Sequence, residues 1–264
     1  MNSSLSRVSK FIVFIVGILF FMAQLPVGVI AAADEPAGKA AQESALKAIQ
    51  ENDTPENRVR LAAVRHDHAS MILDLPKKEP NIKALEEAVA YAQSATVLEP
   101  ENAGHWFLTG LLFRKLEGKD KRAAAMAEQA LWKAVEIDPE HTASWLELGL
   151  IMAEQERGRE AMTALENALK SDPVRTALVA TGPLCAMYVL NDEGFRGIDF
   201  FQELYASNPE VPALGVGSAI MLDYLGDREA AIEQARDVMI IEEAGTPEHD
   251  YAAKLVSEWE GAKP

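Results

Sequence analysis

Few residues of this sequence could carry chemistry, and the histidines come first. His66 and His68 flank Asp67, and imidazole and carboxylate groups bind divalent metal ions. On a helix, however, residues two apart point away from each other, and no other cluster of strong ligands stands nearby. We therefore predict ordinary surface or interface histidines and no metal site. The remaining histidines stand beside expected helix starts, where capping and solvation explain them: His105, His141 and His249.

Cys185 is the single cysteine of the chain. It excludes an internal disulfide and any zinc or iron–sulfur site that needs several cysteines of one chain. A nucleophilic cysteine needs a base and a lowered pKa, but the neighbours Leu184 and Ala186 are apolar, so we predict that Cys185 packs in a core. The GxSxG, HExxH and GxxxxGKS/T patterns do not occur. We predict no catalytic residue, no cofactor and no enzymatic activity.

The first 33 residues are typical of an export signal. Arg7 and Lys10 precede an apolar run over residues 11–23, and small residues lead to Ala33. This order predicts a signal peptide that is cleaved after Ala33. The alternative is an uncleaved anchor, because residues 11–33 are long enough to span a bilayer. Both readings keep the basic start in the cytoplasm, so we expect a periplasmic protein or one anchored in the cytoplasmic membrane with its body outside.

Charge and composition limit the class of partner. Hydrophobic residues make up 48% of the sequence and charged residues 25%, so most of the chain should fold. Lys and Arg number 25 against 41 Asp and Glu, which gives a formal net charge of −16 at pH 7. A charge this negative repels phosphate, and we predict no nucleic-acid partner.

An internal repeat organises the rest of the chain. The segments VLEPEN, EIDPEH, KSDPVR and ASNPEV place prolines 39, 34 and 36 residues apart, which fits a 34-residue period with insertions of five and two residues. One repeat reads Trp145-x2-Leu148-Gly149-x2-Met152, then Ala161-x3-Leu165, Ala168 and Pro173. Its neighbour reads Trp106-x2-Thr109-Gly110-x2-Phe113, then Ala127-x3-Leu131, Ala134 and Pro139.

This pattern resembles the tetratricopeptide repeat (TPR), whose signature is W-x2-L-G-x2-Y, then A-x3-F, then P. The resemblance is strongest over residues 103–175 and extends from 69 to 245. It implies an all-α fold, a TPR-like α-solenoid of antiparallel helix pairs. The physics agrees, because small residues such as Gly110 and Gly149 allow close helix approach and prolines after each second helix turn the chain.

Three departures from the repeat lead to specific expectations. Residues 76–81 hold two prolines, so we expect the first helix of that repeat near 55–74. The insertion after Leu116 predicts longer helical arms or a wider turn. Pro183 falls inside an expected first helix and leaves its start open.

The expected domain organisation has four parts. Residues 1–33 form the signal peptide or anchor, 34–54 a linker or lead-in helix, 55–245 the repeat domain, and 246–264 a C-terminal capping helix, which such arrays need for solubility.

The resemblance implies that the first helices of the pairs line a concave groove where partners bind. The equivalent positions here are mostly apolar, including Val179, Ala186, Val189, Val216 and Ile220. A basic clamp for a C-terminal carboxylate is therefore not expected. Either the chain itself covers this groove, or the groove receives an apolar helix or strand of a partner. The predicted anchors of such a partner are Phe107, Leu111, Leu146 and Leu150.

Together these observations predict a non-enzymatic scaffold or adaptor that binds proteins outside the cytoplasmic membrane. It would help to assemble or hold an envelope complex, such as a secretion or maturation machine. The alternative is a structural protein that assembles with its own copies into a homo-oligomer.

Overall fold

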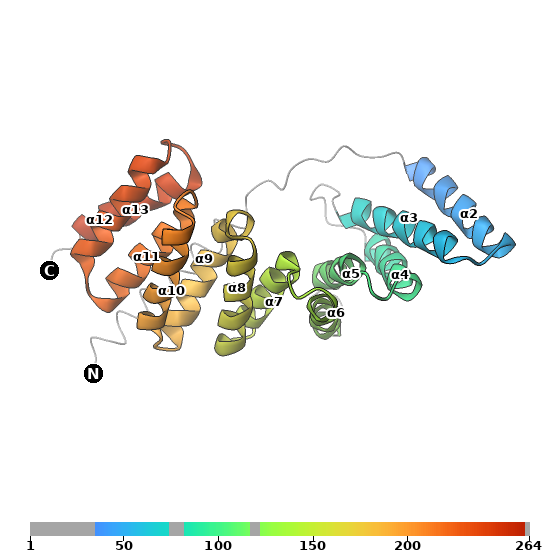
Figure 1. Ribbon diagram of the computed structural model, residues 1–264, viewed down its shortest axis with the longest axis horizontal. Coiled ribbons are helices and arrows are strands. Elements are labelled where there is room, and N and C mark those ends of the chain that lie inside the picture. The colour runs from blue at the N-terminus through green and yellow to red at the C-terminus, as the bar shows by residue number, and fades with distance from the viewer. Residues whose placement is uncertain (1–34, 74–81, 117–121, 262–264) are drawn as a thin grey trace. The chain divides into compact units, whose positions relative to one another are not determined.

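The computed structural model describes residues 35–73, 82–116 and 122–261, and these residues form α-helices joined by turns (Figure 1). The predicted all-α class is confirmed. The apolar segment 11–33 lies outside the described residues. The helices of the described part are α2 (Glu35–Glu51), α3 (Pro55–Leu73), α4 (Ile82–Leu98), α5 (Ala103–Leu116), α6 (Ala123–Ile137), α7 (Thr142–Glu154), α8 (Gly158–Ser171), α9 (Pro173–Leu190), α10 (Gly194–Ser207), α11 (Pro212–Leu225), α12 (Arg228–Ile241) and α13 (Pro247–Gly261).

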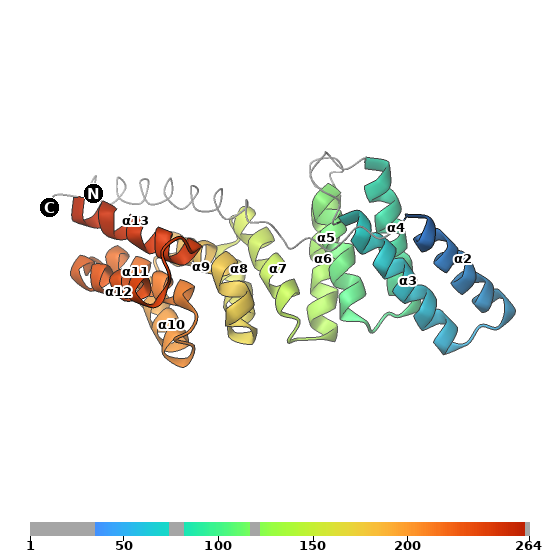
Figure 2. The same cartoon turned by 90° about the horizontal axis from the view of Figure 1, so that it is seen from above.

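The helices group into two compact units, divided between Ser144 and Trp145. The N-terminal unit contains α2 to α6 and the first residues of α7, and the C-terminal unit contains the rest of α7 and α8 to α13. Within each unit, helices that follow one another in sequence pack side by side and reverse direction (Figure 2). The predicted antiparallel pairs are α3 with α4, α5 with α6, α7 with α8, α9 with α10, and α11 with α12.

Glycines hold the two helices of a pair close together in both units. In the N-terminal unit, a Cβ atom on Gly110 of α5 would lie 2.7 Å from Cγ of Leu131 on α6. In the C-terminal unit, a Cβ atom on Gly149 of α7 would lie 2.6 Å from Cγ of Leu165 on α8. Both leucines are fully buried. The predicted close approach at these glycines is confirmed.

The proline turns of the N-terminal unit share the same backbone hydrogen bond. After α4, the amide of Asn102 donates to the carbonyl of Glu99 (3.2 Å), and the Asn102 side chain accepts from the amide of Gly104 (3.1 Å). After α6, the amide of His141 donates to the carbonyl of Asp138 (3.0 Å), whose side chain accepts from the amide of Glu140 (3.1 Å). The repeated sequence motif thus builds two equivalent turns at the same end of neighbouring pairs.

The structure bears on two departures from the repeat in the first half of the chain. Helix α3 occupies Pro55–Leu73, as predicted for the first helix of that repeat. Helices α5 and α6 have 14 and 15 residues, against 13 and 14 for α7 and α8. The described helical arms are therefore each one residue longer, and residues 117–121 lie outside the described residues.

Helix α9 accounts for the 36-residue spacing. It runs for 18 residues without interruption and contains Pro183, which lacks an N–H for the carbonyl of Val179. The helix begins directly at Pro173, so the open question of its start is answered. By length and composition alone α9 could cross a membrane, but 67% of its apolar window is buried, as expected for a core helix.

Helices flank the repeats at both ends of the described chain. Helix α2 packs on α3, and α13 packs on α12 and α11. The apolar side of α13 is buried at Leu255, Val256 and Trp259. Its Tyr251 is largely enclosed, and this burial raises the pKa of the phenol.

Candidate functional site

The four predicted partner anchors form two pairs, one in each unit. Phe107 and Leu111 lie one turn apart on α5, and Leu146 and Leu150 lie one turn apart on α7. Residues four apart share one helix face, and all four side chains are half-buried rather than enclosed. Each unit therefore presents one partly open apolar pair on a first helix. A single groove that joins the two pairs stays a prediction.

Of the other predicted groove positions of the C-terminal unit, Val179 is half-buried and four are closed to solvent. Ala186, Val189, Val216 and Ile220 are only 3–7% exposed. At these four positions of α9 and α11 the chain itself covers the apolar side chains. A partner can reach the C-terminal unit at Leu146 and Leu150 but not at these positions.

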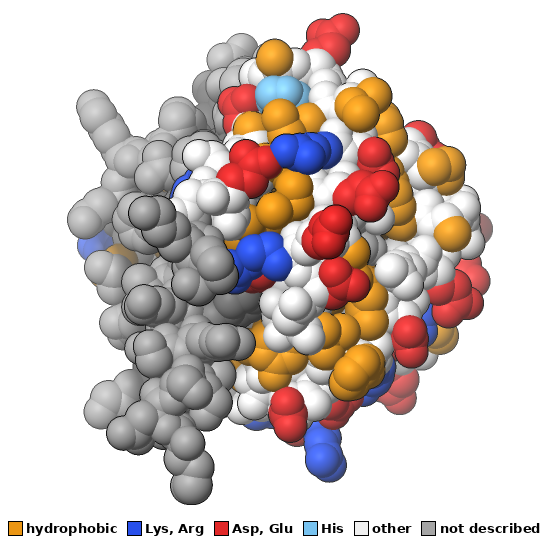
Figure 3. Space-filling view, turned by 90° about the vertical axis from the view of Figure 1, so that its left-hand side faces the viewer, with side chains coloured by type: hydrophobic (Ala, Val, Ile, Leu, Met, Phe, Trp, Pro, Cys, Tyr) orange, Lys and Arg blue, Asp and Glu red, His pale blue; other side chains and the backbone are white. Residues whose placement is uncertain are grey.

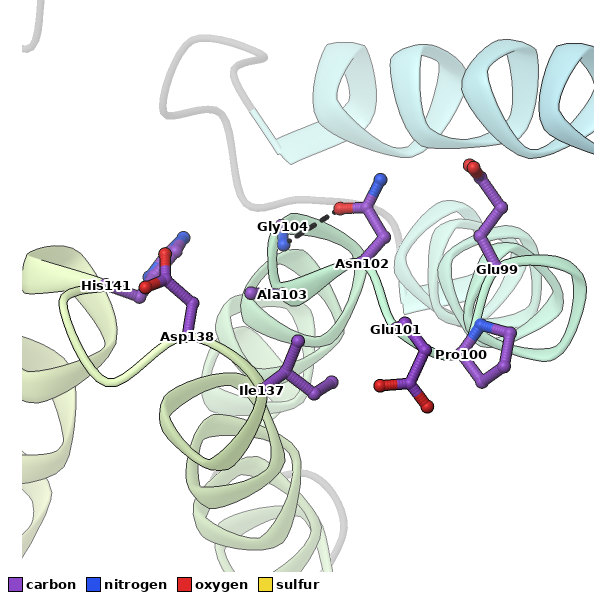
Figure 4. Close-up of a pocket in the computed structure, with 9 residues that line it drawn as sticks. All are labelled: Glu99, Pro100, Glu101, Asn102, Ala103, Gly104, Ile137, Asp138 and His141. Carbon is purple, nitrogen blue, oxygen red and sulfur yellow. Dashed lines mark hydrogen bonds between the residues drawn. The ribbon is translucent and has the colours of Figure 1, made fainter.

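The two proline turns of the N-terminal unit border an open hollow of about 720 Å³. In Figure 4 one turn supplies Glu99 to Gly104 and the other supplies Ile137, Asp138 and His141. The lining includes three carboxylates and no Lys or Arg. The carboxylates of Glu99 and Glu101 point in opposite directions from their turn (Figure 4). The ring of His141 contacts Phe107 at 5.1 Å between centroids, so the hollow adjoins the apolar pair of α5.

Beside this hollow, three side chains form what we call the histidine cluster: His66, His105 and Glu99. Nδ1 of His66 on α3 lies 3.0 Å from Nδ1 of His105 on α5. Nε2 of His105 lies 2.9 Å from Oε2 of Glu99 at the end of α4. His105 is 5% exposed. Burial, and then the neighbouring charge of His105, lower the pKa of His66.

The histidine cluster corrects one prediction. His105 was expected to be a solvated residue at a helix start, but it is buried and bonded to two ionisable side chains. Sequence reasoning missed this because His66 and His105 are 39 residues apart. The one available signal was that both lie on first helices of successive repeats, which neighbour each other in a solenoid.

His66 and His68 diverge, as their spacing predicts. His66 faces α5, whereas the ring of His68 packs on Tyr91 of α4 at 4.8 Å. Within the described residues, no group of three or more His, Cys, Asp or Glu side chains has the placement to hold a metal ion.

His141 and His249 have the local partners expected near helix starts. Nδ1 of His141 lies 2.9 Å from Oγ of Ser144. His249 is half-buried, and its Nδ1 lies 3.3 Å from Oδ1 of Asp250.

The C-terminal unit has a different polar group, which we call the carboxylate cluster: buried Glu166 and Tyr188 with the half-exposed side chain of Arg196. The Tyr188 hydroxyl donates to Oε1 of Glu166 (2.8 Å), and Nη2 of Arg196 donates to the same oxygen (2.6 Å). The guanidinium also lies over the Tyr188 ring at 5.8 Å. These residues come from α8, α9 and α10, so the cluster ties one helix pair to the next.

Cys185 is a packing residue, as predicted. It is 1% exposed, and its Sγ lies 3.9 Å from the carbonyl oxygen of Gly217 on α11. Burial raises the pKa of the thiol well above its ordinary range. A thiol held protonated is a poor nucleophile.

Known proteins were compared with this chain at the levels of sequence and structure. No protein-family model and no curated protein matches the sequence. Among solved structures, YrrB, "a TPR protein with an unusual peptide-binding site", is 18% identical, covers 81% of this chain and 100% of its own, and gives a TM-score of 0.52. MamA from Desulfovibrio magneticus is 20% identical, with coverage of 68% and 97% and a TM-score of 0.45. A tetratricopeptide repeat protein from Parabacteroides merdae is 15% identical, with coverage of 85% and 88% and a TM-score of 0.47.

The likeness to YrrB confirms the predicted fold. At 18% identity it concerns the arrangement of helices and not the chemistry of any site. The chain has the tetratricopeptide-type α-solenoid fold.

Proposed function

We propose that this protein is a non-enzymatic scaffold that binds another protein outside the cytoplasmic membrane and helps to hold an envelope complex together. The observation that carries the proposal is the pair of half-open apolar residues on the first helix of a repeat, found once in each unit. The export part of the proposal rests on the sequence of residues 1–33.

The spacing of these pairs fits an apolar segment of a partner. Side chains four residues apart on a helix form a short stripe that an amphipathic helix can cover. Each Å² of apolar surface buried contributes about 25 cal/mol, and association itself costs several kcal/mol, so the apolar pairs would act as anchors within a larger contact. YrrB is described as having a peptide-binding site, and we propose a peptide-like segment as the partner here.

The acidic surface favours a partner with basic flanks. The net charge is −16, and complementary charge at the rim of an interface raises association rates. The hollow beside Phe107 adds three carboxylates to that rim in the N-terminal unit. We expect binding to weaken as salt concentration rises.

Affinity capture after mild crosslinking in the protein's own cells tests this function. One variant carries Leu146→Asp with Leu150→Asp, and a second carries Phe107→Asp with Leu111→Asp. The matched control carries Val174→Asp with Leu190→Asp, because both residues are apolar but already 67% and 52% exposed. We expect capture to be lost in at least one of the first two variants and kept in the control, with the helical signal of circular dichroism unchanged.

If both Asp double variants of the apolar pairs still capture the partner, these pairs do not bind it. The same samples test export, because the mass of the N-terminal peptide shows whether residues 1–33 have been cut. Recovery of the protein in the cytoplasmic fraction would contradict the proposed location.

Self-assembly is the second candidate, and exposed apolar side chains favour it. Phe195 of α10 and Ile240 of α12 are 76% and 80% exposed, and hydrophobic patches lie between acidic side chains on the C-terminal end of the molecule (Figure 3). Sedimentation velocity over a wide range of concentration distinguishes the candidates. A monomer at all concentrations removes self-assembly, whereas a concentration-dependent oligomer that captures no other protein favours it.

A further inference from the structure

The contact between His66 and His105 has room for one proton. The two facing atoms are both Nδ1, 3.0 Å apart. An imidazole nitrogen either carries a hydrogen and donates, or lacks one and accepts. A hydrogen bond therefore forms only when one of the two Nδ1 atoms is protonated and the other is not.

Glu99 fixes the other side of His105. With Nε2 of His105 2.9 Å from the carboxylate, that nitrogen carries a hydrogen and donates it. A neutral His105 then accepts from His66 at Nδ1, whereas a cationic His105 donates to a neutral His66. Both arrangements keep the 3.0 Å contact. A second proton on the pair would place two N–H groups and two positive charges face to face.

Burial holds the His105 side of the pair in place. His105 is 5% exposed and His66 is half-buried, so the His105 ring has no way into water in the packed structure. Burial and the charge of His105 lower the pKa of His66, in agreement with the geometry. The second proton is thus bound less readily in the folded chain than in the unfolded one.

The Glu99 carboxylate favours one positive charge, on His105, and the charges nearest His66 are of both signs. Asp67 is exposed on α3, and its charge acts on His66 in the opposite direction and more weakly than burial and His105. The guanidinium of Arg65 bonds to Ser94 of α4 and adds positive charge to the same helix. Other titratable residues on these elements include Glu56, Arg58, Arg60 and His68 of α3, Glu43, Lys47 and Glu51 of α2, Lys83, Glu86, Glu87 and Tyr91 of α4, Glu101 after α4, Arg114 and Lys115 of α5, Glu128, Lys133 and Glu136 of α6, and Asp138 and His141 after α6.

We propose that the histidine cluster is a pH-sensitive contact between the first two helix pairs. The contact is closed when one of the two facing Nδ1 atoms carries a proton, and it opens when both do. Opening would separate α3 from α5 and disturb Glu99, which lines the neighbouring hollow. Acid would thereby loosen the N-terminal unit next to its apolar pair. The proposal does not depend on the identity of a partner.

The sign of the effect follows from linkage. When the folded state holds a histidine pKa below its unfolded value of about 6.5, the unfolded or open state binds more protons below that pH. Stability is then complete above about pH 6.5 and falls as the pH decreases. For one proton, the equilibrium for opening changes by up to about tenfold for each pH unit.

Hydrogen–deuterium exchange of the full chain between pH 7.5 and 5.5, corrected for intrinsic exchange rates, tests the proposal. We expect protection of peptides from α3 and the start of α5 to fall by about tenfold, while peptides of α8 to α10 keep theirs. In His66→Gln, a neutral amide that donates and accepts replaces one ring, and the loss of protection should disappear. The control His141→Gln removes a histidine of the same unit and should respond as the wild type does.

Unchanged protection of α3 and α5 in the acidified wild type would overturn the proposal. An undiminished acid response in His66→Gln would overturn it equally. If that variant does not fold, NMR titration of wild-type protein labelled with ¹³C-histidine decides. We expect the His66 ring to titrate below the ordinary histidine range and the signals of the His105 ring to change at that same step. A His66 titration in the ordinary range, with no response of the His105 ring, would refute the shared proton.

Discussion

The two units join successive helix pairs with different polar chemistry. In the N-terminal unit the link between α3 and α5 is the histidine cluster, whose contact depends on how many protons it holds. In the C-terminal unit the link across α8, α9 and α10 is the carboxylate cluster, where a phenol and a guanidinium donate to one oxygen of Glu166. The same solenoid geometry can therefore be built with a titrating link or with a permanent one.

The histidines of the sequence follow this division. Four of the five histidines fall between residues 66 and 141, and His249 is the fifth. The strongly shifted groups of the C-terminal unit are instead Cys185, Tyr188 and Tyr251, whose pKa values are raised, with burial as the largest cause. We expect the N-terminal unit to be sensitive to acid and the C-terminal unit to alkali.

The largest expected effect tests whether the units unfold separately. Gly149→Val would force a side chain into Leu165, and we expect a loss of about 3 kcal/mol, the upper end for overpacking. Gly110→Val should cost the N-terminal unit a similar amount against Leu131. Urea unfolding with peptide-resolved amide exchange measures both. The control is Gly261→Ala, since nothing lies within 4 Å of the added atom.

If either glycine variant destabilises both units equally, the division at Ser144 is not a boundary of cooperative unfolding. The histidine cluster and the carboxylate cluster could then not be compared as links of two units that unfold separately.

The second effect concerns the carboxylate cluster. In Glu166→Gln the buried acceptor loses its charge, and we expect the C-terminal unit to lose about 2 kcal/mol, in the range for hydrogen bonds to charged groups. The loss should be the same at pH 5.5 and 7.5. Glu193→Gln removes a more exposed partner of Arg196 and should cost at most about 1 kcal/mol. A loss that changes strongly between the two pH values would contradict a permanent link.

The third effect is the response to alkali. The pKa of Cys185 is raised in the folded state, so the unfolded chain releases this proton first and stability falls as the pH increases. At pH 9.5, about one unit above the ordinary thiol pKa of about 8.5, the loss should be about 1.4 kcal/mol. Guanidinium unfolding midpoints of wild type and Cys185→Ala measure it. The variant should lose less between pH 8 and 9.5, and equal losses would exclude the thiol.

The smallest effect involves exposed ion pairs, which should not distinguish the units. Arg58 with Asp53 in the N-terminal unit and Arg236 with Glu260 in the C-terminal unit are each roughly half-exposed. Such pairs often contribute nothing measurable. We expect Arg58→Gln and Arg236→Gln to leave the urea midpoints unchanged in 0.5 M salt. If only one of the two variants lowers the urea midpoint, the units differ in their surface ion pairs as well.

The sequence predicted the fold well because its signal is periodic and local. Gly110, Gly149 and the prolines mark helix contacts and turns within one repeat, and the structure places them as the pattern requires. Pro183 was harder, because helix α9 accommodates it in its interior and no local rule indicates that.

The polar links were beyond sequence reasoning for a physical reason. His66 with His105, and Glu166 with Tyr188, are contacts between helices far apart in the chain, and their register depends on packing. The covered positions Val216 and Ile220 show the same limit, since apolar residues on a first helix can face either a partner or the protein's own core.

The most direct test of the comparison is the free energy of unfolding of each unit as a function of pH, measured on the full chain by urea titration with peptide-resolved amide exchange. We predict that the N-terminal unit loses stability below about pH 6.5 and that the C-terminal unit is constant from pH 5.5 to 8 and loses stability above about pH 9. Parallel loss in both units at both ends of the range would contradict the account.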